Sequence, residues 1–351
     1  MRSTDSAASP LFRTLVTLAI GALGAVAGWL LHAPVYMLLG PAVAVTLAGL
    51  GGIATAIPVG LRDVCFVILG IAVGAGFNAD ALGAMVRWPL AFAFMGVVLW
   101  AILMLSRGLL AGVFGFDRRS ALLAAAPGHL SFVVAMAAEL GSDLGRISIV
   151  QSVRLLSLTI LVPFMALWMG IDVPENIAPQ GLPAPLVDLA LLATAGVLLG
   201  LVFGRIGVPA HLLMGAMTAS ALAHLTDWVP GVLPEWLILP AYLVLGALIG
   251  TRFSGVTFGD LRQGLAAGVA VTLLAAGCAA LASLPVAWAL GMPVPHVLVA
   301  FAPGGLETMI AMGAVLGVVP GFVAACHIAR LFVLTFLLPL MLSRTRDPVR
   351  T

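Results

Sequence analysis

Three polar residues near the end of the chain could do chemistry in surroundings that are otherwise apolar. Glu307 lies among Ala, Val, Leu, Met and Gly, and a carboxylate in such surroundings must be protonated, paired or wet. Arg330 lies ten residues into the last apolar segment, roughly 15 Å along a helix, with His327 one helical turn before it. The three groups could bind an anionic group, relay a proton, or pair to hold two halves of the protein together.

An earlier segment carries a similar pair, because Gln151 precedes Arg154 by the spacing that separates His327 from Arg330. Each pair would lie on one face of a helix. Arg154 lies less deep in its predicted segment than Arg330 does, so its side chain could reach the lipid headgroups instead of a functional site. Both interpretations of Arg154 stay open at this point.

Two Ala-Pro-Gly sequences, at 126–128 and 302–304, interrupt apolar segments close to these polar residues. Proline removes a backbone donor and glycine permits non-helical angles, so a helix should break at each. Paired broken helices mark the substrate site of many secondary transporters, whereas a simple proline kink would only bend a packed helix. The two sequences differ in polarity, because His129 and Ser131 in the first correspond to Gly305 and Glu307 in the second.

We therefore predict a substrate or ion pathway. It would be lined by Pro127, Gly128, His129, Ser131, Gln151, Arg154, Pro303, Gly304, Gly305, Glu307, Thr308, His327 and Arg330.

The composition indicates that lipid surrounds the elements that position these residues. Of 351 residues, 62% are hydrophobic and 9% are charged, with a mean hydropathy of +1.19, whereas a soluble domain carries roughly a quarter charged residues. The apolar stretches are long enough to cross a bilayer as helices, and they lack the alternation of a barrel. The predicted helices cover 13–31, 35–50, 62–76, 88–114, 120–140, 146–169, 186–204, 210–225, 236–251, 261–290, 296–316 and 320–342.

The sequence is similar to itself at an offset of 176 positions. Between 126–165 and 302–341, seventeen positions are identical, and Arg154 corresponds to Arg330. The pattern predicts an all-α integral membrane protein of ten to twelve transmembrane helices in two homologous repeats with Pro-Gly-broken helices, like a secondary transporter. The predicted parts are an N-terminal tail (1–12), a first repeat (13–169), a proline-rich linker (170–185), a second repeat (186–343) and a C-terminal tail (344–351).

Hydropathy does not show whether the two copies are parallel or inverted, because a broken segment can cross the membrane or return to the same side. With the N-terminus inside, the arginines outside the predicted pathway divide nine against five between the two faces, whether the copies are parallel or inverted. The distribution of positive charge therefore leaves this question open.

Other functional classes find little support in the sequence. The chain contains no lysine, no Walker motif, no His-Glu-x-x-His, no Gly-x-Ser-x-Gly and no Cys-x-x-Cys. Its arginines are scattered singly, which argues against a nucleic-acid partner. Its three cysteines and six histidines have no metal-ligand spacing, so we expect no cofactor and no metal.

A family resemblance rests on specific motifs. Leu-Leu-Gly-Pro at 38–41, Leu-Met-Gly-Ala at 213–216 and Ala-Pro-Gly-Gly-Leu-Glu-Thr-Met at 302–309, with His327 and Arg330 downstream, resemble the membrane AbrB family of bacteria. The first copy departs from the motif, with His129 in place of the second glycine. Members are named as regulators of gene expression or as ammonia monooxygenases. The resemblance implies a membrane protein with a link to regulation.

These observations lead to a ranked set of functions. The first is a permease of the bacterial inner membrane for a small molecule or ion. The protein would be embedded in the lipid bilayer and could form a homo-oligomer. The alternative is a membrane-embedded regulator that acts through a partner protein. A monooxygenase comes third, because the sequence shows no ligand set for a metal.

Overall fold

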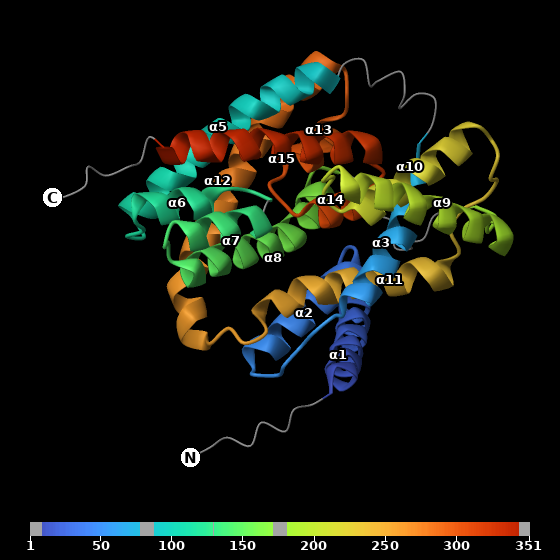
Figure 1. Cartoon of the computed structure of the whole chain (residues 1–351), viewed down its shortest axis with the longest axis horizontal. Coiled ribbons are helices and arrows are strands. Elements are labelled where there is room, and N and C mark those ends of the chain that lie inside the picture. Colours follow the sequence, from blue (N-terminus) through green and yellow to red (C-terminus); the bar gives the residue numbers. More distant parts are fainter. Residues whose placement is uncertain (1–8, 78–87, 129, 171–180, 344–351) are drawn as a thin grey trace.

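The computed structural model describes residues 9–77, 88–128, 130–170 and 181–343, and most of this part of the chain is helical (Figure 1). The helices are α1 (Pro10–Leu30), α2 (Tyr36–Leu50), α3 (Val59–Gly74), α5 (Trp88–Gly112), α6 (Arg118–Ala125), α7 (Leu130–Glu139), α8 (Leu144–Trp168), α9 (Leu186–Arg205), α10 (His211–Leu225), α11 (Glu235–Gly250), the short 3-10 helix η2 (Thr251–Phe253), α12 (Phe258–Leu290), α13 (Val294–Phe301), α14 (Leu306–Val315) and α15 (Pro320–Ser343).

Seven of the described helices are long and apolar enough to cross a membrane. They are α1, α5, α8, α9, α11 together with η2, α12 and α15. The prediction of an all-helical protein with several helices of membrane-spanning length is confirmed. The part of the predicted linker at 171–180 lies outside the described residues, and beyond it Pro183 pairs with Val232 in an isolated β-bridge.

One group of helices comprises α1, α2, α3, α9, α10 and α11, and glycines allow its backbones to approach closely. A Cβ atom on Gly24 of α1 would lie 2.4 Å from the carbonyl oxygen of Gly40 in α2. Likewise, a Cβ on Gly70 of α3 would lie 2.5 Å from the carbonyl oxygen of Leu213 in α10. Close helix contact through small residues is typical of helix pairs in membranes, where water does not drive apolar surfaces together.

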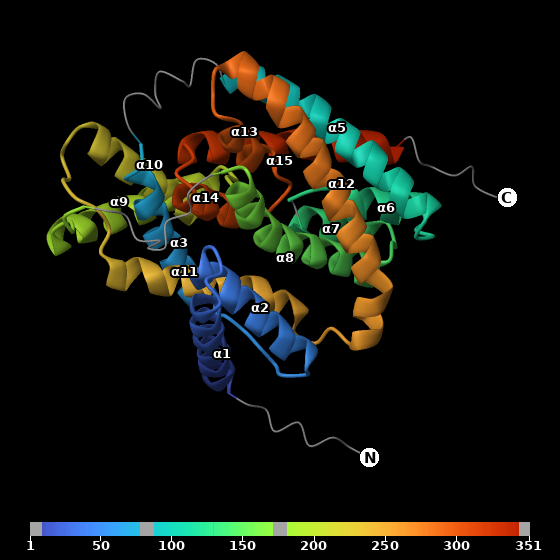
Figure 2. The same cartoon turned by 180° about the vertical axis from the view of Figure 1, so that it is seen from behind.

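The second group comprises α5 to α8 and α12 to α15. Figure 2 shows the long helices α5 and α12 packed side by side on the outside of this group. The shorter helices α6 and α7 pack against α8, and the shorter helices α13 and α14 pack against α15. Glycines again make a close contact, because a Cβ on Gly268 of α12 would lie 2.7 Å from Val153 of α8.

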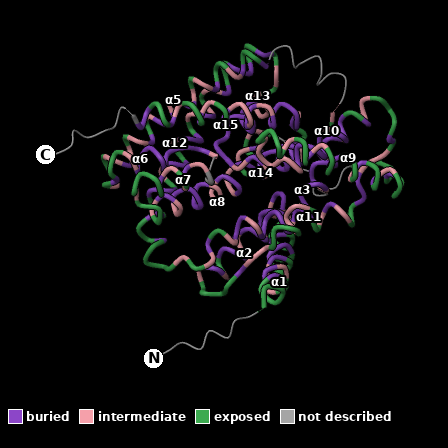
Figure 3. The backbone as a smooth tube through the Cα atoms, viewed as in Figure 1, coloured by how far each residue is buried: buried purple, intermediate pink, exposed green. Residues whose placement is uncertain are grey.

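Burial follows from this arrangement of the two groups. Figure 3 shows that buried residues concentrate where the helices meet, whereas the outer helices expose much of their length. The exposed side chains on those helices are large and apolar, among them Leu23 of α1, Val97 of α5 and Leu198 of α9. Large apolar side chains over so much of the surface suit lipid rather than water as the surrounding medium.

The contact between α3 and α10 leads to a test of stability. In the Gly70→Ala variant the added methyl group would clash with backbone atoms, so we expect destabilisation by about 1–3 kcal/mol. Gly96→Ala in α5 is the matched control, because nothing lies within 4 Å of a Cβ there. Thermal unfolding of the purified variants in detergent would measure both. A Gly70→Ala variant as stable as Gly96→Ala would contradict the close contact.

Candidate functional site

A cavity of about 380 Å³ lies where the two groups of helices meet. Residues from the start of α3, the middle of α8, the end of α11, η2 and the connection between α13 and α14 surround it. The lining residues are Arg62, Phe66, Gly128, Gln151, Ser152, Arg154, Leu155, Pro209, Ala210, Leu245, Leu248, Ile249, Arg252, Pro303, Gly304, Gly305, Leu306, Glu307, Thr308 and Leu331.

The C-terminal end of α6 is held by two side chains of α8. Arg154 donates hydrogen bonds to the carbonyl oxygens of Ala124, Ala125 and Ala126, at 3.4, 3.3 and 2.9 Å. Gln151 donates to the carbonyl oxygens of Leu123 and Ala126 and accepts a hydrogen bond from Arg154. The last carbonyl groups of a helix have no partner within it, so these side chains satisfy acceptors that burial would otherwise leave unpaired.

Arg330 of α15 holds the corresponding end of α13. Its Nη1 and Nη2 atoms donate to the carbonyl oxygens of Ala302 and Gly304, both at 2.8 Å. The same guanidinium lies against Gly128, where a Cβ atom would be 2.8 Å from Nη2. Gly128 has a φ of +88°, a conformation that favours glycine. Arg330 therefore brings the two Pro-Gly segments together.

The predicted network of Glu307, His327 and Arg330 is not formed. Arg330 binds backbone carbonyl groups, while Glu307 is partly exposed and lines the cavity. His327 is fully buried and bonds through Nδ1 to the carbonyl oxygen of Val323, 2.9 Å away. The predicted pairing of these three side chains was wrong because the partners of Arg330 are backbone carbonyl groups at the end of a helix. Such groups cannot be recognised from the polar side chains in the sequence.

The idea that Arg154 reaches the lipid headgroups is also wrong. Helix α8 begins at Leu144, so Arg154 lies ten residues into it, as deep as Arg330 lies in α15. Its side chain is buried and points to the end of α6.

The other predicted residues divide between the cavity and its surroundings. Pro303, Gly304, Gly305 and Thr308 line the cavity, and Pro127 is buried beside it without being a lining residue. His129 lies outside the described residues, and for Ser131 the structure describes the backbone in α7 but not the side chain.

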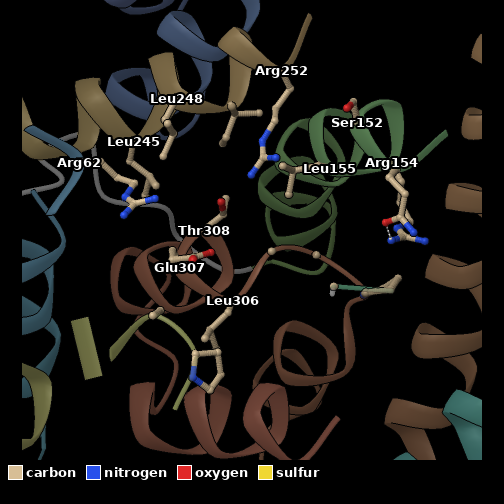
Figure 4. A pocket seen from close by; sticks show the side chains of 18 of the residues that line it. Arg62, Ser152, Arg154, Leu155, Leu245, Leu248, Arg252, Leu306, Glu307 and Thr308 are labelled. Carbon is tan, nitrogen blue, oxygen red and sulfur yellow. Dashed lines mark hydrogen bonds between the residues drawn. The ribbon is translucent and has the colours of Figure 1, made fainter. Parts of the chain in front are cut away.

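Two cationic residues of the cavity were not among the predicted site residues. Arg62 lies in the first turn of α3, and Arg252 lies in η2 after the end of α11 (Figure 4). In the sequence both look like arginines that flank a membrane span. Arg62 is at the start of α3 and Arg252 follows the end of α11. Nothing in the sequence around them indicates that the fold brings these two helix ends together near Glu307.

Among the described residues, no group of three or more His, Cys, Asp or Glu side chains is placed to hold a metal ion. The chemistry available in the cavity is therefore that of guanidinium groups, one carboxylate, the hydroxyl groups of Ser152 and Thr308, the side-chain amide of Gln151 and backbone groups.

Fold and site together define a polytopic helical protein, with helices of membrane-spanning length around an arginine-containing cavity. The family described as Transition state regulatory protein AbrB matches residues 37–346, and the chain belongs to this family. A protein of Escherichia coli strain K12 named "Putative regulator AbrB" is 26% identical over 311 residues, covering 86% of this chain and 87% of the relative. "Uncharacterized protein YhjN" of Bacillus subtilis strain 168 is 25% identical over 288 residues, covering 78% and 75%.

The bidentate bonding of Arg330 leads to a second test. In the Arg330→Lys variant a single ammonium group replaces two donors in a fixed fork, so one carbonyl group loses its partner. We expect a loss of stability of about 1–3 kcal/mol, measured by thermal unfolding in detergent. Arg262→Lys, at an exposed position in the first turn of α12, is the control and should leave the unfolding temperature unchanged. Equal stability of the two variants would argue against a role for Arg330 in holding α13.

Proposed function

We propose that the chain is a secondary-transporter-type permease for a small solute in the bacterial inner membrane, with its substrate site in the cavity. One observation carries the proposal. Two interrupted helical segments, far apart in the sequence, meet at a single cavity in the middle of the bundle. Backbone groups freed at membrane depth are tolerated where they line a wet cavity, and such sites serve substrate binding in many transporters.

The first interrupted segment has the geometry of a re-entrant hairpin. The residues before α6 and after α7 lie together, because the amide of Asp143 donates to Oγ of Ser120 at 3.3 Å and Arg146 donates to the carbonyl oxygen of Phe114 at 3.0 Å. The tip at Gly128 lies against Arg330, deep in the bundle. Helices α6 and α7 thus enter from one face of the membrane and return to it.

The capping of α6 fits this position of the hairpin base. Asp117 accepts hydrogen bonds from the amides of Arg119 and Ser120. Burial by itself raises the pKa of Asp117, but hydrogen bonds from the side chain of Ser120 and from backbone amides outweigh burial and lower the pKa of the carboxyl group. A charged carboxylate at the N-terminus of α6 is stable at a water-facing surface.

The second interrupted segment supports the same geometry. A Cβ on Gly313, near the end of α14, would lie within 3.7 Å of both Val299 in α13 and Val323 at the start of α15. The tip at Ala302 and Gly304 is bound by Arg330, seven residues further along α15 than Val323. Helix α15 therefore runs beside α13 in the same direction, and α14 returns between them.

A duplication accounts for the paired elements. Helices α1, α2, α3, α5, α6, α7 and α8 correspond in order to α9, α10, α11, α12, α13, α14 and α15. Val35 and Ala210, the residues just before α2 and α10, both have a left-handed conformation, with φ of 51° and 49°. Such a conformation is uncommon outside glycine, so its recurrence supports a shared origin of the two parts.

We infer that the two copies are inverted. With the hairpins re-entrant, and with the shorter helices α2, α3 and α10 of 15, 16 and 15 residues crossing beside the seven longer ones, five helices cross the membrane in each copy. An odd number of crossings reverses the second copy. The packing agrees with this topology. Gly246 and Gly250 of α11 lie against Leu38 and Val45 of α2, so these two helices run in the same direction. Contacts of the same kind show that α3 and α10 run in the same direction, as they must if the second copy is inverted. The two hairpins then enter from opposite faces and meet at the cavity.

This arrangement resolves the distribution of arginines. Every described arginine except Arg154 and Arg330 then lies at one face, near the starts of α1, α3, α6, α8 and α12, near the ends of α5 and α9, or in η2. They are Arg13, Arg62, Arg107, Arg118, Arg119, Arg146, Arg205, Arg252 and Arg262. Positive residues favour the cytoplasmic face. The cavity, with Arg62 and Arg252 at its edge, would therefore open toward the cytoplasm.

Labelling of single cysteines tests this topology. In a background without Cys65, Cys278 and Cys326, we expect Val113→Cys and Leu140→Cys to react from the cytoplasmic side. Both positions are exposed, at the two ends of the first hairpin. Trp228→Cys, exposed between α10 and α11, should react from the other side. A crossing segment would instead place Val113 and Leu140 on opposite sides of the membrane.

Transport itself can be measured by charge displacement in proteoliposomes on a solid-supported membrane. Succinate, benzoate, glutamate, arginine and glucose as probes cover anionic, zwitterionic, cationic and neutral solutes. We expect Glu307→Gln to change the rate about tenfold or more for a transported probe, since it removes the carboxylate of the cavity. Glu139→Gln, at the exposed end of α7, is the matched control. Unchanged transport by Glu307→Gln would remove this residue from the site.

The name of the Escherichia coli relative favours a second candidate function, a membrane-embedded regulator that acts through a partner. It predicts a change in transcript levels on deletion of the protein that persists in a variant without transport. A transcript change that follows the transport rate of each variant would favour the permease.

A further inference from the structure

We propose that the cavity binds a small organic anion, a carboxylate with an apolar body, and that Arg62 and Arg252 determine this specificity. The inference rests on the proposed permease and names the substrate class of the same site. It is drawn from the charges, the backbone donors and the apolar wall of the cavity.

The mouth of the cavity carries two guanidinium groups from different helices. Figure 4 shows Arg62 and Arg252 extending into the cavity toward the end that holds Glu307 and Thr308. Arg62 is paired with Asp63 at 2.7 Å, and this pair is more than a quarter exposed, so it is weak and leaves donors of Arg62 available. Arg252 is exposed and forms no ion pair with the described residues. Guanidinium groups are the usual partners of carboxylates because their donors match two oxygen atoms.

The floor of the cavity offers backbone donors. Helix α14 begins there at Leu306, and its N-cap residue Gly305 has no side chain that could cap the first amides. These amides and the positive end of the helix dipole favour an anion, and the hydroxyl group of Thr308 lies beside them. The arginines, rather than the helix end alone, make this a site.

The balance of charge also favours an anion. The cavity is lined by Arg62, Arg154 and Arg252 against the single carboxylate of Glu307. Arg154 and, behind the wall, Arg330 bind neutral carbonyl groups, so no described carboxylate compensates their charge. Positive charge in a partly dry cavity is stabilised by an anionic ligand far more than it would be in water.

The apolar part of the cavity wall favours an organic anion over an inorganic one. Phe66, Leu155, Leu245 and Leu248 also line the cavity. An inorganic ion would leave these apolar surfaces wet, whereas a carboxylate with a hydrocarbon body covers them. The volume of about 380 Å³ restricts the ligand to a small molecule.

The carboxylate of a free solute and the phosphate of a lipid headgroup would meet the same arginines, so the test must separate them. Purified full-length protein in a neutral maltoside detergent, without added lipid, is titrated with butyrate, hexanoate, adipate and suberate. Butyramide and hexanamide serve as neutral probes of the same shape, and phosphate serves as the headgroup analogue. The rise in unfolding temperature reports binding to the folded state.

We expect at least one carboxylate to stabilise the wild-type protein at millimolar concentration, while amides and phosphate do not. Arg252→Gln and Arg62→Gln should each weaken this binding roughly tenfold to a hundredfold, the loss for a charged hydrogen bond. Arg262→Gln, an exposed arginine of the same face outside the cavity, is the matched control and should bind like the wild type.

Several results would overturn the inference. They are equal stabilisation by amides and carboxylates, stabilisation by phosphate alone, equal binding by Arg252→Gln, Arg262→Gln and the wild type, or no effect of any carboxylate. Carboxylate binding without transport would leave the inference standing and remove the permease. Transport of arginine or glucose without carboxylate binding would retain the permease and remove the anion.

Discussion

The bonding of two buried arginines to backbone carbonyl groups is the interaction on which the centre of this protein depends. A helix that stops inside an apolar bundle leaves carbonyl groups without partners, and each costs free energy unless something replaces the missing bonds. Arg154 and Arg330 supply several donors in a rigid plane, and each lies ten residues into the helix that follows the interrupted segment. The guanidinium charge is also favourable at the C-terminal end of a helix dipole.

This bonding has a consequence for the cavity. Because Arg154 and Arg330 are occupied by the ends of α6 and α13, they position the two Pro-Gly segments instead of acting as free cations at the site. The other polar groups that line the cavity come from elsewhere, namely Arg62, Arg252, Glu307 and the first amides of α14, and they are the groups that we propose bind the ligand. In the proposed site, one pair of arginines therefore positions the Pro-Gly segments and a different pair binds the ligand.

The two groups of helices are held together differently. In the group of α1, α2, α3, α9, α10 and α11, glycines such as Gly24, Gly40 and Gly70 bring helix backbones into direct contact. Substitution there would require whole helices to move apart, which suits a rigid frame. The cavity lies between this group and the one that contains the interrupted segments. In the proposed permease, relative movement of the two groups would change which face of the membrane the cavity meets.

The helical class, the positions of most helices and the presence of polar residues that need partners in apolar surroundings could all be predicted from the order of the amino acids. These predictions are possible because helix length and hydrophobicity are local properties of the sequence, and a lipid bilayer requires apolar segments that satisfy their own backbone hydrogen bonds. The sequence also pointed to Pro303, Gly304, Glu307 and Arg330, since proline, glycine and charge are conspicuous in an apolar segment. The partners of these polar residues, in contrast, depend on how the helices pack. Carbonyl groups freed at Ala126 and Ala302 have no signature of their own, and the ends of α3 and α11 that carry Arg62 and Arg252 meet over Glu307 only through long-range packing.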